Sequence, residues 1–329
     1  MTFVKDNKLM ARKGKYLPLV GVLLFLMLFM MIDLDVLIIV IKKVDLTIYI
    51  AAVLLSLPIL LIRAFRWQLL LIDKDIKYDF NSVFASYLIG IFIGLFTPGR
   101  AGELARVFFV TNDCGVSTGR AFPSVLIDRL FDLSVILAVG LIALIDFTAD
   151  NHFSSIMAII LLVVLCSLSM IFIIHPKAKL ILQNIVKWLI RNKYWAAKVS
   201  SFVDDMHQSI ILLKKQTLVR SIGLTLLSYA IFFMQCFLIA MSLGLQITLV
   251  EISYALSLAT LVAFLPISIS GIGTRDIMLI SYMASLSIST EQALGFSILF
   301  LGAFHVFAAI TGLMAICVRT YIQEKPFLI

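Results

Sequence analysis

Phe96-Thr-Pro-Gly-Arg-Ala-Gly-Glu-Leu-Ala-Arg106 interrupts an apolar run that starts near Val83 and would otherwise continue as a membrane helix. We expect the helix to break at Thr97, Pro98 and Gly99, because proline lacks a donor N–H and glycine leaves the backbone free. A break inside an apolar run places polar backbone at membrane depth. Such backbone is tolerated only where it is buried in protein or lines a polar cavity.

A second stretch of the same kind lies far downstream, at Leu265-Pro-Ile-Ser-Ile-Ser-Gly-Ile-Gly-Thr-Arg-Asp276. In the first stretch, Arg100, Glu103 and Arg106 are spaced three residues apart, so they should lie near one another on the resumed helix. Charges in such surroundings are costly in lipid and usually serve a function. The residues expected to break the two helices are Thr97, Pro98, Gly99 and Gly102 in the first stretch and Pro266, Gly271 and Gly273 in the second.

The composition identifies the class of protein. Of 329 residues, 62% are hydrophobic and 14% are charged, whereas soluble domains are about half apolar and a quarter charged. We therefore predict an all-α polytopic membrane protein. The net charge of +8 indicates basic cytoplasmic loops rather than nucleic-acid binding. No metal or cofactor is expected, because the cysteines and histidines show no ligand spacing: Cys114, Cys166, Cys236, Cys317, His152, His175, His207 and His305.

Apolar runs of about 20 residues predict the spanning helices. Six candidates are long enough, and two further apolar segments, 81–111 and 251–287, are broken near their middles and should form re-entrant hairpins or half-helices. The six predicted spans are 16–33, 47–72, 121–146, 154–174, 218–243 and 292–318.

Positive charge predicts the orientation. The N-terminus, segment 176–217 and the C-terminal tail are basic, whereas the loops at 147–153 and near Glu291 are not. We expect both termini to be cytoplasmic, in the cytoplasmic membrane. Segment 176–217 mixes basic, aromatic and apolar residues, which favours amphipathic helices lying on the inner leaflet.

The two halves of the chain share one order of elements. Segments 47–146 and 218–318 each run helix, broken segment, helix, and the loop charges make the broken segments enter from opposite sides. We therefore expect a single membrane domain, residues 1–329, that contains an inverted repeat. Paired interrupted segments in corresponding positions are the best sequence indication of a transporter site at the bilayer midplane.

Both breaks have the residues of an anion site. A helix that restarts after a glycine-rich turn presents unsatisfied N–H groups and a positive dipole end. Arg100 and Arg275 add forked donors that match phosphate. Glu103 and Asp276 are expected to pair with these arginines at rest. The alternative is that these charges only close two hairpins as structural ion pairs.

Asp128, Arg129 and Asp132 form a third cluster, in the helix after the first break. The two aspartates share one face and would partner Arg100 or Arg106, bind a cationic group, or shuttle protons. Arg63 and Arg66 are further candidates, although we expect Arg66 to reach the cytoplasmic surface by snorkelling. His305 is expected to be a packed, hydrogen-bonded histidine.

These residues carry a resemblance to a known family. Thr97 to Arg106, Gly115-Val-Ser117, Val125-Leu-Ile-Asp-Arg-Leu-Phe-Asp132 and Pro266 to Asp276 resemble the signature of the lysylphosphatidylglycerol synthase transmembrane-region family, also called the flippase-like domain family. Arg63-Ala-Phe-Arg-Trp67 is similar to its second-helix motif. The resemblance covers about residues 15–318.

The resemblance implies movement of a lipid headgroup across the bilayer. The family includes the flippase half of the multiple-peptide-resistance proteins, hopanoid-associated members and archaeal proteins linked to dolichol glycosylation. Members that make lysyl-lipid have a soluble aminoacyl-transferase domain after the membrane part. No such domain follows here, so lysyl transfer by this chain is not expected.

Three hypotheses follow from the sequence. The first is a flippase-like transporter of an anionic or zwitterionic phospholipid, or of a polyprenyl-phosphate-linked headgroup. The second is a membrane enzyme acting on a lipid phosphate, and the third is a non-transporting subunit of a lipid or glycan assembly pathway. Membrane lipids are the expected partners, and a homo-oligomer or a partner enzyme is compatible with the sequence. The predicted substrate-binding residues are Arg100, Glu103, Arg106, Asp128, Arg129, Asp132, Arg275 and Asp276.

Overall fold

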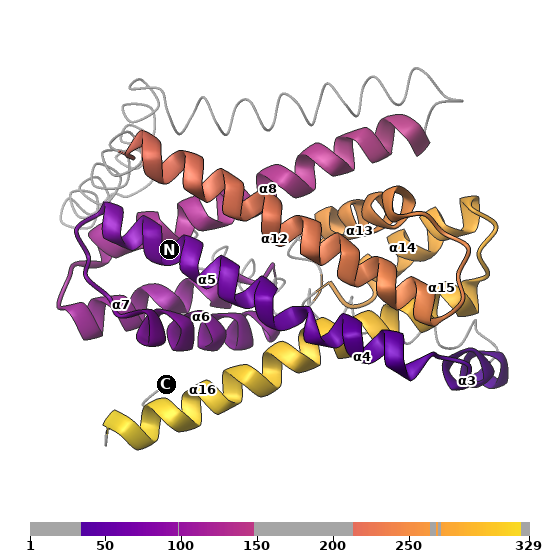
Figure 1. The fold of residues 1–329 in the computed structure, drawn as a ribbon, viewed down its shortest axis with the longest axis horizontal. Helices are drawn as coiled ribbons and strands as arrows, with labels where there is room; N and C mark the ends of the chain where they lie inside the picture. Colours follow the sequence, from indigo (N-terminus) through magenta and orange to yellow (C-terminus); the bar gives the residue numbers. More distant parts are fainter. Residues whose placement is uncertain (1–33, 98, 148–212, 264–267, 269–270, 324–329) are drawn as a thin grey trace, which may run out of the picture.

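The computed structural model describes residues 34–97, 99–147, 213–263, 268 and 271–323. Within these ranges every regular element is a helix, which confirms the all-α prediction (Figure 1). The first half contains α3 (Leu34–Lys42), α4 (Leu46–Leu54), α5 (Ser56–Asp73), α6 (Phe80–Leu95), the 3₁₀ turn η1 (Ala101–Ala105), α7 (Arg106–Cys114) and α8 (Thr118–Phe147). The second half contains α12 (Lys215–Ser242), α13 (Leu249–Ala263), α14 (Thr274–Ser285), α15 (Thr290–Phe300), the π-helical turn η2 (Leu301–Val306) and α16 (Phe307–Gln323).

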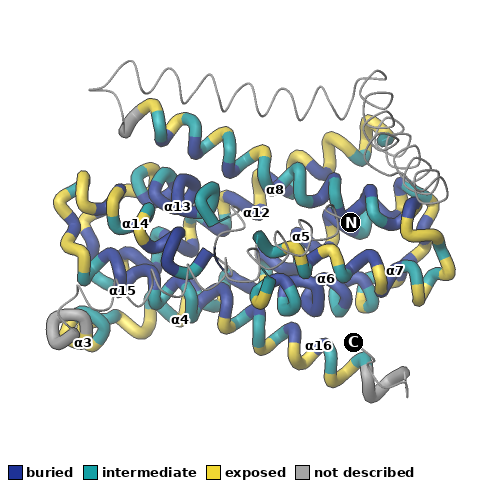
Figure 2. The backbone as a smooth tube through the Cα atoms, turned by 180° about the vertical axis from the view of Figure 1, so that it is seen from behind, coloured by how far each residue is buried: buried dark blue, intermediate teal, exposed yellow. Residues whose placement is uncertain are grey.

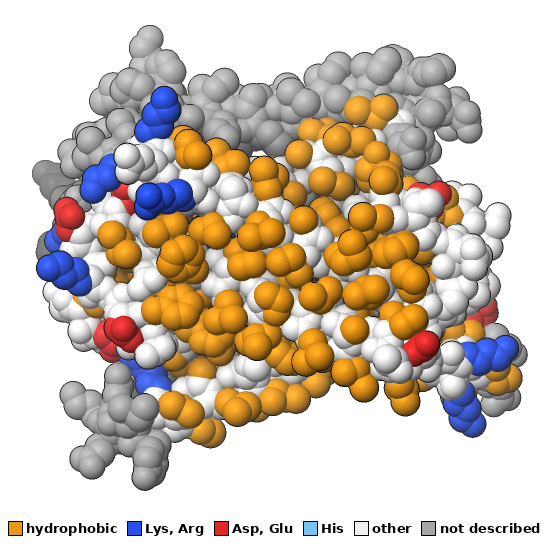
Figure 3. Space-filling model, in the orientation of Figure 1, with side chains coloured by type: hydrophobic (Ala, Val, Ile, Leu, Met, Phe, Trp, Pro, Cys, Tyr) orange, Lys and Arg blue, Asp and Glu red, His pale blue; other side chains and the backbone are white. Residues whose placement is uncertain are grey.

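Several of these helices are long and apolar enough to cross a bilayer. Three stretches meet both criteria, Leu46–Asp73, Lys215–Ser242 and Thr290–Arg319. Helix α8 has 30 residues and is therefore about 45 Å long. Figure 3 shows hydrophobic side chains covering the middle of the molecule, with Lys, Arg, Asp and Glu gathered at its two ends. The chain is a multi-pass membrane protein.

The predicted helices agree with the structure wherever it describes them. Predicted spans 47–72, 121–146, 218–243 and 292–318 correspond to α4–α5, α8, α12 and α15–α16, and both broken segments are interrupted as expected. Residues 34–46 lie between the first two predicted spans, and within them residues 34–42 form the short helix α3. Spans 16–33 and 154–174 and most of segment 176–217 lie outside the described residues.

Two apolar cores lie side by side along the molecule. The first core joins α5, α6, α7 and the start of α8 with α16, around Trp67, Tyr87 and Val110. The second core joins α12 to α15 and η2 with α4 and the later part of α8, around Phe232, Met283 and Phe296. Figure 2 shows the buried residues along the inward faces of these helices. Each core therefore contains a helix from the other half of the chain.

The helix contacts repeat a pattern across the two halves. Helix α8 packs on α13, and α16 packs on α6 in the corresponding way. Both crossings are close because a glycine lies at the contact. A Cβ at Gly140 would lie 2.6 Å from the Leu261 side chain, and a Cβ at Gly312 would lie 2.6 Å from Phe92 Cβ. Small residues allow membrane helices to approach this closely.

Candidate functional site

The first break is a tight turn rather than an immediate helix restart. Gly99 and Arg100 both have left-handed backbones, with φ of 59° and 56°. Thr97 Oγ1 donates to Gly94 O at 3.1 Å and accepts from Gly102 N at 2.7 Å, which closes the turn. We expected Arg100 to begin an α-helix, but it precedes η1, and the α-helix begins at Arg106.

Two glycines of α6 leave room for the chain after the break to pack closely against this helix. A Cβ at Gly90 would lie 2.4 Å from Arg106 Cγ, and a Cβ at Gly94 would lie 2.6 Å from Glu103 Cγ. These contacts hold the Glu103 and Arg106 side chains against α6, and both residues are buried. The spacing of Gly90 and Gly94, four residues apart, is the small-residue pattern typical of close helix packing.

Asp128 is the centre of a buried ion network between α5, α7 and α8. Its Oδ1 accepts from Arg66 Nε at 2.8 Å, and its Oδ2 accepts from Arg106 Nη1 at 3.0 Å. Asp128, Arg66 and Arg106 are all fully buried. The Arg106 guanidinium also lies over two aromatic rings, 4.9 Å from the centre of Trp67 and 4.7 Å from that of Tyr87.

The expectation that Arg66 snorkels was wrong. Its guanidinium donates to Asp128, to Asp132 Oδ1 at 2.8 Å, and to Thr225 Oγ1 at 2.8 Å on α12. Three acceptors inside the protein replace the water that snorkelling would provide. Arg66 therefore links α5 and α8 of the first half to α12 of the second half through buried hydrogen bonds.

Arg129 completes the network on the exposed side. Its Nη2 lies 2.6 Å from Glu103 Oε2 and 3.4 Å from Asp132 Oδ2. Glu103 was expected to pair with Arg100, but it pairs with Arg129 instead, because the left-handed turn separates the residues at 100 and 103. Glu103 and Arg106 of the first predicted cluster thus join the second cluster in one network, whereas Arg100 stays outside it.

The second break resumes its helix as predicted. Gly273 is the N-cap residue of α14, with φ of 84°, and its N–H donates to Asp276 Oδ2 at 2.9 Å. Asp276 Oδ1 accepts from Arg275 Nη2 at 2.6 Å and from Ser297 Oγ at 2.5 Å. Arg275 and Asp276 pair as expected. Pro98 and Pro266 lie outside the described residues.

One internal cavity lies between the two breaks. Four arginines line it: Arg63 from α5, Arg100 from the first break, Arg129 from α8 and Arg275 from α14. Its volume is about 50 Å³, which is room for a few water molecules. The other lining residues are Asp132, Ile136, Tyr229, Phe232, Thr260, Ala263, Phe300, Phe304 and His305.

His305 connects the two breaks across this cavity. Its Nε2 accepts from Arg100 Nη2 at 3.0 Å, and it experiences the charges of both Arg100 and Arg275. It is hydrogen-bonded and buried as expected, yet it also lines the cavity. It sits in the π-helical turn η2, and such turns are frequent at functional sites. A lone histidine in an apolar helix gives no sequence signal for this placement.

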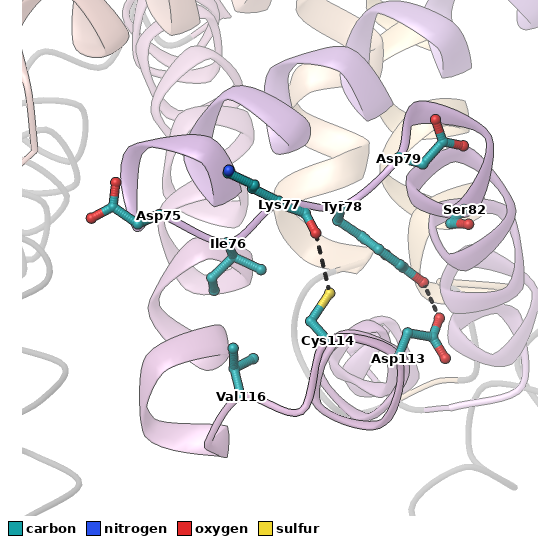
Figure 4. Close-up of a pocket in the computed structure, with 9 residues that line it drawn as sticks. All are labelled: Asp75, Ile76, Lys77, Tyr78, Asp79, Ser82, Asp113, Cys114 and Val116. Atoms are coloured by element: carbon teal, nitrogen blue, oxygen red, sulfur yellow. Dashed lines mark hydrogen bonds between the residues drawn. The ribbon is translucent and has the colours of Figure 1, made fainter.

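A larger opening of about 520 Å³ lies at the end of the bundle, where α5 meets α6 (Figure 4). There Tyr78 donates to Asp113, which also pairs with Arg319 Nη2 at 2.6 Å. Burial and this hydrogen bond raise the pKa of Tyr78 to about 12. The opening is lined by Asp75, Asp79 and Asp113, so it is a poor site for an anion.

The predicted residues thus converge, with differences in role. Arg63, Arg100, Arg129, Asp132 and Arg275 line the cavity, whereas Glu103, Arg106 and Asp128 lie in the ion network behind it, together with Arg66. The sequence did not indicate Thr225, Tyr229, Phe232 or Ser297. In the described ranges, no group of three or more His, Cys, Asp or Glu side chains is placed to hold a metal ion.

Comparison with known proteins identifies the family of this chain. It is 23% identical to the UPF0104 membrane protein MJ1595 of Methanocaldococcus jannaschii, over 97% of this chain and 98% of that protein. It is 24% identical to the UPF0104 membrane protein PH1989 of Pyrococcus horikoshii, over 87% and 90% of the two chains, and 24% identical to one of Methanothermobacter thermautotrophicus, over 83% and 86%. The profile of the lysylphosphatidylglycerol synthase TM region matches residues 18–312. The chain therefore belongs to the lysylphosphatidylglycerol synthase transmembrane-region family.

Proposed function

We propose that this protein moves a lipid with a phosphate-bearing headgroup across the membrane, with the four-arginine cavity as the headgroup site. The observation that carries the proposal is that Arg100 and Arg275, one from each break, line the same buried cavity. Guanidinium groups match phosphate oxygens with paired donors. The headgroup passes through the cavity while the lipid tails stay in the bilayer.

The repeated packing pattern supports this mechanism. The pairs α8–α13 and α16–α6 place the third helix of each half on the broken segment of the other half. An inverted repeat with its site between two broken segments is the architecture of many secondary transporters. Rocking of one half against the other then opens the cavity to each side in turn.

The exposed charges support the proposed orientation. Arg120 donates to Lys74 O at 2.8 Å and Thr217 donates to Asp73 Oδ1 at 2.8 Å, so the ends of these helices lie at one end of the bundle. The basic residues of the described chain are concentrated at that end. We therefore place it in the cytoplasm, by the positive-inside rule, with the first broken segment entering from there. The basic residues at this end are Lys74, Lys77, Arg120, Lys214, Lys215 and Arg319.

The network geometry argues against the enzyme hypothesis. A general base needs a carboxylate free to accept a proton. Asp128 accepts from both Arg66 and Arg106, and Asp132 accepts from Arg66 and lies beside Arg129. Both aspartates are therefore already paired with arginines, so their positions suit structure and charge balance better than proton transfer.

Reconstitution tests the proposal. Purified protein is placed in liposomes with fluorescent phospholipid analogues, and a membrane-impermeant quencher reports how fast the label crosses. We expect the wild type to accelerate crossing and Arg100→Ala to slow it at least about tenfold, since one charge-assisted contact is worth about 1.5–3 kcal/mol. The exposed Arg220 on α12 provides the matched control, and Arg220→Ala should retain the wild-type rate.

The alternatives predict different outcomes. Equal rates for wild type, Arg100→Ala and empty liposomes across all lipids would sink the transport proposal. Turnover of a lipid phosphate, seen by mass spectrometry and lost in Asp128→Asn, would favour an enzyme. If a folded Arg100→Ala/Arg275→Ala protein still restores the phenotype of cells that lack the wild-type protein, a non-transporting subunit would be favoured.

A further inference from the structure

The acidic residues around the cavity are already paired. Each of the four carboxylates has at least one arginine partner: Glu103 with Arg129, Asp128 with Arg66 and Arg106, Asp132 with Arg66 and Arg129, and Asp276 with Arg275. Two carboxylate oxygens, Glu103 Oε2 and Asp132 Oδ2, make no hydrogen bond in the described chain, but Arg129 Nη2 lies 2.6 and 3.4 Å from them. A headgroup amine that approached either oxygen would therefore meet the positive charge of Arg129.

Several buried donors also have no hydrogen-bond partner among the described residues. Arg63 is 8% exposed, and its Nε makes no hydrogen bond there. Its guanidinium instead lies over the Tyr229 and Phe232 rings, 4.9 and 5.9 Å from their centres. Arg275 is 3% exposed, and its Nη1 is likewise without a partner in the described chain.

Arg100 and His305 add two more donors on the same cavity. Arg100 has no carboxylate within ion-pair distance in the described ranges, and its side chain hydrogen-bonds to His305 Nε2. Because arginine only donates, Nε2 must accept, and the proton of the neutral imidazole lies on Nδ1. That buried Nδ1 makes no hydrogen bond to any described residue, so it offers a neutral donor.

The count of charges around the cavity indicates the charge of the anion that would neutralise it. Six arginines, at positions 63, 66, 100, 106, 129 and 275, stand against four carboxylates, at 103, 128, 132 and 276. The described side chains therefore carry two surplus positive charges, and the stretch between Ala263 and Gly271 has no charged residue. Each arginine at mid-bilayer costs about 2.5–3.5 kcal/mol on insertion scales. A bound dianion removes the surplus, whereas a monoanion leaves half of it.

We infer that the cavity takes a dianionic phosphate, a phosphate monoester or a diphosphate, between Arg63, Arg100 and Arg275. This inference rests on the proposed function and narrows its substrate class. A monoester carries about −1.5 to −2 charges at neutral pH because its second pKa is near 6. A phosphodiester headgroup carries one negative charge, and the amine of a zwitterionic headgroup would add to the positive surplus. The small volume of the cavity suits a compact headgroup.

Binding measurements test the inference directly. Full-length protein in nanodiscs of neutral lipid is titrated with short-chain phosphatidic acid, phosphatidylglycerol, phosphatidylethanolamine or inorganic phosphate. We expect phosphatidic acid to bind at least about tenfold more tightly than phosphatidylglycerol, since one more charge is engaged. This preference should decrease as the pH is lowered from 8 to 5, because the monoester dianion takes up one proton and becomes a monoanion.

Two variants assign the binding to the cavity. Arg63→Gln and Arg100→Gln should each reduce phosphatidic acid affinity about tenfold, whereas Arg220→Gln should leave it unchanged. Circular dichroism and thermal unfolding show whether each variant is folded, and a folded variant with unchanged affinity would overturn the assignment. Equally tight inorganic phosphate would support the dianion preference and identify a free-phosphate site.

The binding assay tests the dianion inference and the transport assay tests the proposed function, so either can be contradicted without the other. If phosphatidylglycerol binds as tightly as phosphatidic acid at pH 8, the dianion inference is wrong, even where labelled phosphatidylglycerol still crosses the bilayer. If phosphatidic acid binds with the expected preference and no lipid crosses, the inference stands and the transport proposal is wrong.

Discussion

Asp128→Asn should destabilise the protein by about 3 kcal/mol. Breaking a buried ion pair by removing one partner typically costs about 3–5 kcal/mol. Asp128 serves two buried arginines, Arg66 and Arg106, which raises the cost. The asparagine keeps one acceptor oxygen, and Arg66 keeps Asp132 and Thr225, so the lower end of the range applies.

Unfolding by sodium dodecyl sulfate in mixed micelles provides the measurement. Trp67 is fully buried beneath Arg106, so its fluorescence should follow the loss of the network. Asp75→Asn is the matched control, because Asp75 is exposed and its left-handed backbone, φ of 55°, is tolerated by asparagine. The control should stay within about 0.5 kcal/mol of the wild type.

The comparison has one outcome that contradicts the reasoning. If Asp128→Asn and Asp75→Asn both unfold at the wild-type detergent fraction, the buried arginines do not depend on Asp128. Asp128→Glu would then be uninformative. If Asp128→Asn is destabilised as expected, partial recovery in Asp128→Glu indicates that the charge, rather than the shape, supports the network.

Three further predictions concern other contacts. Gly312→Ala should destabilise by about 1–3 kcal/mol through overpacking against α6, measured by thermal unfolding, whereas Gly223→Ala, which meets open space, should not. The free energy of unfolding should fall by about 2 kcal/mol between pH 10 and 12, because folded Tyr78 keeps its proton while the unfolded chain loses it; Tyr78→Phe should lack this decrease in detergent titrations at each pH. Ser297→Ala should lower the stability by about 1 kcal/mol, since it removes a hydrogen bond to Asp276 Oδ1, and the unfolding midpoint reports it.

Local chemistry made the breaks predictable. Glycine-rich turns interrupt both long apolar runs, and helix lengths follow from hydropathy, so the elements appear in the structure nearly where the sequence places them. The pairing of Arg275 with Asp276 follows from adjacency and from the capping geometry at Gly273. These features depend on neighbours in the chain.

The roles of Arg63, Arg66 and His305 depend on long-range packing, which the sequence does not show. Arg63 and Arg66 lie three residues apart on one helix, yet Arg66 enters the ion network and Arg63 faces aromatic rings and the cavity. The difference arises from what the neighbouring helices present: Arg66 meets Asp128 and Asp132 of α8 and Thr225 of α12, whereas Arg63 meets the Tyr229 and Phe232 rings of α12. The role of His305 likewise depends on a π-helical turn and on Arg100, some 200 residues away.

Each core contains a helix from the other half of the chain, and this has a consequence for folding during translation. Helix α6 ends at Leu95, and α16, which covers it, begins at Phe307. At about 5–20 residues per second, roughly 200 residues of translation take about 10–40 s. Through that time the α6 surface around Leu88 and Phe92, which Gly312 of α16 later covers, faces lipid or an insertion factor. The first core is completed only when the last described helix is made, so a nascent chain halted before α16 should be sensitive to proteolysis in both halves.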